Sequence, residues 1–137
     1  MAEVTIFVQG EGFSQYCGGS VNKMINKARN DNVCCKVVYP PGNEWGRINH
    51  AGKWLMEIRS GVLRPSNFTL GEFYQELFGF PHPKIFNFCP TACVAATRDA
   101  IKKHPIEFYR KAISFVDDHS NPEEGHYLER LWHDMFS

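Results

Sequence analysis

The first forty residues contain two apolar runs separated by a polar stretch with helix-forming character. Residues 4–8 are β-branched and aromatic and lead into two nearby glycines, which predicts a buried strand followed by a loop. Ser20 or Asn22 can cap a helix that runs to about Asn30. Residues 33–39 form a second apolar run that a Pro-Pro-Gly sequence ends. Because the helix supplies a crossover, we expect a β-α-β unit with parallel strands.

The middle of the chain has a weaker pattern. Residues 42–64 sustain neither the helical nor the strand period, so we expect a loop with a short helix or strand around residues 54–58. Thr69 and Glu72 have the spacing of a capping box, which predicts a helix through about Phe78. A Pro-His-Pro sequence follows and stops that helix.

The C-terminal third contains the clearest helix starts. Residues 85–88 and 93–97 are short apolar segments that can form one bent strand or a hairpin-like pair. Asp99 begins a helical turn. Pro105 then opens a longer helix to about Asp118, because a proline suits the first turn of a helix. Asn121 is expected to cap the last helix, because a proline follows it and a glutamate stands three residues later.

Together these elements predict one α/β domain that spans residues 1–137. The length is that of one compact domain. We expect a small, mainly parallel open sheet with flanking helices and a C-terminal helical pair. The apolar side chains of that pair should be buried, because their spacing forms a stripe: Phe108, Ile113, Leu128, Leu131 and Trp132.

Composition narrows the class of function. Fifteen basic residues balance fifteen acidic ones, so the chain has no overall field that would attract nucleic acid. The sequence contains no apolar run long enough for a signal peptide or a membrane span. Five cysteines make an odd number without metal-ligand or redox spacing, and we expect free thiols in a cytoplasmic protein.

Three groups of residues could take part in chemistry. On the last helix, His126, Glu129 and His133 share one face, which is either the wet face of an amphipathic helix or a site for proton transfer. Gln9 and Glu11 follow the first strand, where open α/β sheets place ligands, although the neighbouring glycines are equally explained by a turn. The third group is a mixed basic and aromatic stretch that suits a diphosphate and a sugar ring, or a protein surface: Trp45, Arg47, His50, Lys53, Trp54 and Arg59.

Two stretches resemble a known family. Residues 87–136 read NFCPTACVAATRDAIKKHPIEFYRKAISFVDDHSNPEEGHYLERLWHDMF, and residues 4–13 read VTIFVQGEGF. They resemble a little-characterised family of fungal, bacterial and viral domains that is grouped by analogy with nucleotide-sugar glycosyltransferases. Members carry a small-aromatic strand, then (S/T)R-x-x-I-x-x-x-P-x-x-FY, then Glu-x-x-Trp. Here the second pattern starts at Thr97, and the third matches Glu129 and Trp132.

The resemblance implies a transferase that moves a sugar from a nucleotide sugar to a glycan or another hydroxyl acceptor. Glu129 would be the catalytic base, and Glu11 would bind a divalent cation, Mn or Mg, although the acidic pair of such enzymes is reduced to one acid here. Gln9, Trp45, Arg47 and His126 are the candidate substrate-binding residues.

This interpretation requires Glu11 and Glu129 to face a common cleft at the carboxyl ends of the strands. Members of the family commonly carry an earlier strand and helix, so the resemblance implies either a shortened version of the domain or a partner chain that supplies these elements. The alternative is a non-catalytic binding or assembly module in which both acids are solvated surface residues.

Overall fold

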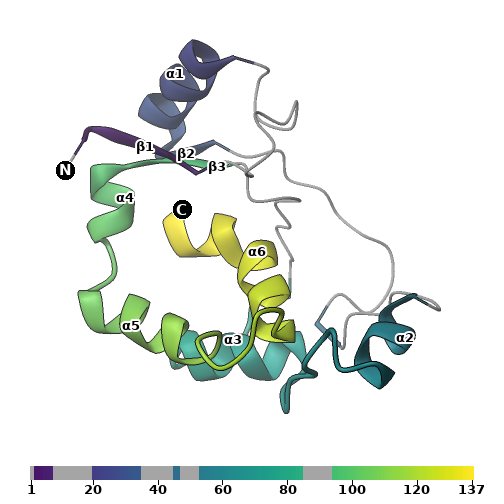
Figure 1. Cartoon of the computed structure of the whole chain (residues 1–137). Helices are drawn as coiled ribbons and strands as arrows, with labels where there is room; N and C mark the ends of the chain where they lie inside the picture. Colours follow the sequence, from purple (N-terminus) through teal and green to yellow (C-terminus); the bar gives the residue numbers. More distant parts are fainter. Residues whose placement is uncertain (1, 8–19, 35–44, 47–52, 85–93) are drawn as a thin grey trace. The chain divides into compact units, whose positions relative to one another are not determined.

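A computed structural model describes residues 2–7, 20–34, 45–46, 53–84 and 94–137 (Figure 1). The chain divides into two compact units, each assembled from segments that are distant in sequence. Unit 1 comprises Met1–Tyr39, Asn87–Pro105 and Glu129–Ser137, and unit 2 comprises Pro40–Phe86 and Ile106–Leu128. That the whole chain acts as one domain stays a prediction.

Unit 1 contains a small sheet and its flanking helices. Its elements are β1 (Val4–Phe7), α1 (Val21–Asp31), β2 (Val33–Cys34), β3 (Val94–Thr97), α4 (Arg98–Lys102) and the last part of α6 (Glu123–Phe136). The strand order is β1-β3-β2, so the latest strand in the sequence lies between the two earlier ones. It is antiparallel to both neighbours, with Val4 opposite Thr97 and Val33 opposite Ala96.

The predicted mainly parallel sheet is therefore wrong. β1 and β2 do run in the same direction, since each is antiparallel to β3, but they do not pair with each other. β3 is the most buried strand, with Val94, Ala95 and Ala96 fully covered, and its small side chains suit the central position. Local sequence pattern predicts that strands exist, whereas a pairing across some ninety residues depends on contacts that the pattern does not contain.

The alternation of side chains in β1 explains how unit 1 packs. Ile6 faces the cluster that Met24 and Ala28 of α1 form with Ala95, and Figure 1 shows α1 on one side of the sheet. Phe7 points to the other side, because successive side chains of a strand alternate between faces. There its ring stacks on two rings of α6: Trp132 at 6.5 Å and Phe136 at 5.8 Å between centroids.

The start of α1 follows a predicted signal. The hydroxyl of Ser20 accepts a hydrogen bond from the Lys23 backbone N–H at 3.3 Å, as an N-cap residue should. Asn32 ends the helix with φ of 68°, a left-handed conformation that asparagine tolerates better than most residues. This confirms the predicted helix in this region.

Unit 2 is built from helices. They are α2 (Lys53–Arg59), α3 (Leu70–Phe78), α5 (Ile106–Ser114) and the first part of α6. Thr69 caps α3 as predicted, since its hydroxyl accepts from the Glu72 backbone N–H at 3.2 Å. Phe73 is fully buried, and its ring contacts Phe115 at 5.1 Å and Tyr127 at 5.5 Å between centroids.

The predicted apolar stripe on the last two helices is only partly buried. Leu128 and Leu131 are buried as expected, and Phe108 and Trp132 are half-buried. The prediction that Ile113 is buried is wrong, since 59% of this residue is exposed. α5 instead turns Ala112 inward, and the neighbouring position therefore points about 100° away.

Candidate functional site

Four of the residues singled out from the sequence lie outside the described residues: Gln9, Glu11, Arg47 and His50. Glu129 and His126 are both on α6, but Glu129 belongs to unit 1 and His126 to unit 2. The common cleft for Glu11 and Glu129 thus stays a prediction, and so does the metal role of Glu11. Among the described parts of the chain, no three His, Cys, Asp or Glu side chains come together as a metal site.

Trp45 has a structural contact rather than an open binding surface. Its backbone carbonyl accepts from the Gly71 N–H at 2.9 Å, and the Gly46 carbonyl accepts from the Leu70 N–H at 3.2 Å. Its ring stacks on the His82 ring at 4.3 Å between centroids. The first amides of α3 are therefore already satisfied by this segment, and that helix start is not open to an anion.

Gly71 is where this packing is tightest. A Cβ atom at this position would stand 2.8 Å from Cδ2 of His82 and 3.2 Å from the Trp45 carbonyl oxygen. Contacts of that length are repulsive, so only glycine lets the Trp45 segment lie against α3. The backbone carbonyl of Trp45 thus helps to close the helix start, and the Trp45 ring packs on His82.

The predicted chemical face of α6 is half-buried rather than wet. His126, Glu129 and His133 all have intermediate exposure. Nε2 of His126 lies 2.9 Å from Oδ1 of Asn121, which is therefore not used as the predicted helix cap. The Glu123 N–H instead donates to the Arg64 carbonyl at 2.9 Å.

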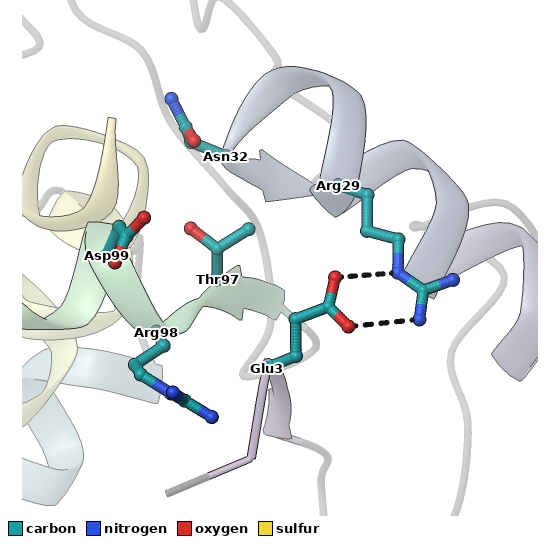
Figure 2. A pocket seen from close by; sticks show the side chains of 6 residues that line it. All are labelled: Glu3, Arg29, Asn32, Thr97, Arg98 and Asp99. Carbon is teal, nitrogen blue, oxygen red and sulfur yellow. Dashed lines mark hydrogen bonds and ion pairs between the residues drawn. The ribbon is translucent and has the colours of Figure 1, made fainter.

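A polar cleft of about 520 Å³ lies within unit 1, a size typical of small-molecule sites (Figure 2). Its described lining comes from three segments that are distant in sequence. These lining residues are Glu3, Arg29, Asn32, Thr97, Arg98 and Asp99.

Backbone hydrogen bonds hold these three segments together. The Thr97 N–H donates to the Asn32 carbonyl at 2.9 Å, and the Arg98 N–H donates to the Glu3 carbonyl at 2.8 Å. The Thr97 hydroxyl accepts from the Ala100 N–H at 3.1 Å, so the same residue ends β3 and caps α4. The cleft is thus framed by secondary structure, not by side chains alone.

The charges of the cleft are paired and balanced. The Arg29 guanidinium donates to both carboxylate oxygens of Glu3, at 3.0 and 3.2 Å, as Figure 2 shows. Nε of Arg98 donates to the Ala2 carbonyl at 3.4 Å, and Asp99 is exposed beside it. The two arginines and two acids of the lining give it no net charge. The other two lining residues contribute one amide and one hydroxyl group. The lining therefore offers both donors and acceptors to a ligand.

Sequence reasoning missed this cleft. The sequence places Thr97 at the end of a strand and at the start of the family-like pattern, and Asp99 at the start of a helix. The available signal was the Thr-Arg-Asp sequence that opens the pattern at Thr97, because its first three residues all line the cleft. Glu3 and Arg29 carry no local signal, since their relation to Thr97 depends on the strand pairing.

In unit 2, Arg64 is also paired with carboxylates, but in different surroundings. Its guanidinium contacts Asp118 at 2.7 Å and Glu124 at 3.0 Å, and it donates to the Phe115 carbonyl at 3.0 Å. Burial by itself lowers the pKa of Arg64, but hydrogen bonds and attraction to Glu124 and Asp118 raise it above the ordinary value. These partners fix Arg64 as a structural group.

The buried acid next to this cluster is also fully engaged. Glu123 accepts from the Ser66 N–H at 3.0 Å, and the Tyr127 hydroxyl lies 2.7 Å from the Glu123 carboxylate and from the Phe68 carbonyl. Both Glu123 and Tyr127 are fully buried. The network links the start of α6 to the segment before α3 inside unit 2.

No family model, curated protein or solved structure matches the chain. The resemblance to glycosyltransferase-like domains therefore stays a prediction. Cys34 lies in β2 and the other four cysteines lie outside the described residues, so the free-thiol state stays a prediction as well. Among the helices that the structure describes, none is long and apolar enough to cross a bilayer.

Proposed function

We propose that the chain is a non-catalytic binding module and that the polar cleft of unit 1 binds a small polar ligand. One observation supports this most: six polar side chains from three distant segments surround one cleft of about 520 Å³. Backbone hydrogen bonds set the positions of Glu3, Asn32 and Thr97 before any ligand arrives. Such preorganisation lowers the entropy that binding costs.

One physical argument for the predicted transferase no longer applies. Glu11 and Glu129 were expected to meet because the carboxyl ends of parallel strands gather at one sheet edge. The strands that the structure describes pair only in antiparallel fashion, so that reason no longer applies. Glu129 is also not among the described residues that line the cleft.

Ligand binding can be tested by two-dimensional amide NMR of the whole chain with a panel of small polar compounds. A supporting result is a set of saturable shifts at Asn32, Thr97 and Asp99, with the Ser66 amide of unit 2 unchanged. Shifts confined to unit 2, or no saturable shift with any compound, would contradict the proposal.

A matched pair of variants shows whether the cleft is responsible. Arg29→Gln removes a cleft arginine that is paired with Glu3. Arg110→Gln removes a more exposed arginine, 69% against 51% for Arg29, that is paired with Glu107 on α5, away from the cleft lining. Binding should weaken in the first variant only. Glu129→Gln should leave binding unchanged, and a sugar-transfer activity that this change abolishes would restore the transferase alternative.

A further inference from the structure

The charge balance of the cleft limits which polar ligands it can accept. Arg29 donates to both carboxylate oxygens of Glu3, so the carboxylate largely neutralises the positive charge of the guanidinium. Asp99 stands next to Arg98 in the lining. A phosphate placed here would meet two carboxylates as well as two guanidinium groups, and the repulsion would offset part of the attraction.

Neutral hydroxyl groups fit the same lining without that penalty. Each hydroxyl donates one hydrogen bond and accepts others. Beside the Glu3–Arg29 pair, one hydroxyl can donate to the carboxylate while its neighbour accepts from the guanidinium, because that pair presents acceptors and donors side by side. Asn32 supplies both functions in one side chain.

Thr97 adds a directed group to the cleft. Its hydroxyl oxygen already accepts from the Ala100 N–H, which holds the oxygen in place and leaves the hydroxyl proton to donate. Figure 2 places Thr97 between Asp99 and Glu3, with Asn32 above it. Polar residues from all three segments therefore lie around Thr97.

We infer that the cleft takes a neutral ligand with adjacent hydroxyl groups, a sugar ring or a similar polyol, and not a phosphate-bearing one. This inference rests on the proposed binding function and adds the chemical class of the ligand. Affinity should be millimolar, because the Glu3 and Arg29 side chains are 65% and 51% exposed and water competes for every hydrogen bond.

The test compares neutral and charged probes on the same amide resonances. The neutral probes are glucose, its 2-deoxy analogue and the trisaccharide cellotriose. The charged probes are inorganic phosphate and uridine diphosphate. We expect glucose or cellotriose to shift Asn32, Thr97 and Asp99, the deoxy analogue to bind more weakly, and neither charged probe to shift these residues. Cellotriose binding more tightly than glucose would indicate a glycan chain, and the reverse order would indicate a free sugar.

Three variants sharpen the result. Glu3→Gln and Arg29→Gln should each weaken sugar binding by about tenfold or more, since each removes a charged hydrogen-bonding partner. Asp99→Asn should leave the fold intact and admit phosphate, because it gives the lining a net positive charge. All three residues are exposed, so circular dichroism should confirm that the variants fold.

The outcomes distinguish a wrong ligand class from a wrong binding function. Phosphate or uridine diphosphate binding in the cleft of the parent protein, without sugar binding, overturns the inference about ligand class and leaves the binding function standing. Sugar binding that survives both Glu3→Gln and Arg29→Gln also overturns it. If no probe of either kind shifts the cleft residues, the proposed function itself fails.

Discussion

Arg29 in unit 1 and Arg64 in unit 2 are both paired with carboxylates, yet their surroundings differ. The Arg29 side chain is 51% exposed and its partner Glu3 65%. Arg64 is 27% exposed, and its partner Glu124 only 6%. The same ion-pair chemistry therefore lies at a wet cleft in one unit and in a covered cluster in the other.

Burial decides what each pair can do. An exposed pair exchanges its hydrogen bonds with water at little net cost, so a ligand can replace that water. A covered pair loses its hydration on folding and must be matched by good partners. Arg64 has them in two carboxylates and the Phe115 carbonyl, which suits a structural role.

The largest effect is expected for Arg64→Met. This change leaves the Glu124 carboxylate buried without its cation, and breaking such a pair costs about 3 kcal/mol when one partner is removed. The value belongs to the low end of the range because Asp118 is half exposed. Urea unfolding followed by circular dichroism measures it.

The double variant Arg64→Met with Glu124→Gln checks the cause. It should recover part of the loss, because the uncompensated charge is gone. Arg64→Met as stable as the parent would show that the covered cluster does not stabilise unit 2 and would remove the contrast with Arg29.

Tyr127→Phe should have the next largest effect. It removes the hydroxyl that lies 2.7 Å from the Glu123 carboxylate and from the Phe68 carbonyl, leaving buried acceptors without this donor. A cost of about 1 to 3 kcal/mol is expected, since the ring itself is kept. Denaturant midpoints of the two proteins give the difference. A Tyr109→Phe variant, on half-buried Tyr109 of α5, is the matched control.

Arg29→Gln should change stability by less than about 1 kcal/mol, because exposed ion pairs contribute little. The parent should lose the same small amount in high salt, which screens surface charges. Thermal unfolding at low and high salt tests both statements. A loss as large as that of Arg64→Met would mean that the cleft pair is structural, and the binding proposal would lose its main residue.

The smallest expected effect is the contribution of His104 to the pH dependence of folding stability. Burial, helped by the charge of Lys103, lowers the pKa of His104, while a hydrogen bond to the Met135 backbone acts the other way. Protonation is then harder in the folded than in the unfolded protein. The contribution to stability is present above the ordinary pKa near 6.5 and is lost as pH falls below it. Unfolding midpoints between about pH 7.5 and 5.5 should fall less in His104→Gln than in the parent, and an equal fall would contradict the assignment.

Local signals predicted the helices well and the sheet poorly. Ser20 and Thr69 cap helices where expected, since a cap depends on residues three positions apart. The last helix begins two residues after Asn121, whose side chain binds His126 instead. The tertiary structure thus gave the Asn121 side chain another hydrogen-bond partner, although its sequence position favours a helix cap.

The candidate site could not be predicted in the same way. Trp45 looked suitable for stacking on a sugar, but its ring stacks on His82 and its carbonyl closes the start of α3. The cleft residues Glu3 and Arg29 are ordinary surface residues in the sequence. They matter only because β3 brings Thr97 beside them.

The sequence by itself determined the helices, because hydrogen bonds within a helix and its caps join residues a few positions apart. It also determined the balance of fifteen basic and fifteen acidic residues. Only the tertiary structure decided that β3 enters between β1 and β2, that Arg64 is covered while Arg29 is wet, and that three segments frame one cleft. Each of these depends on which distant residues meet, and that is set by the burial of the whole chain.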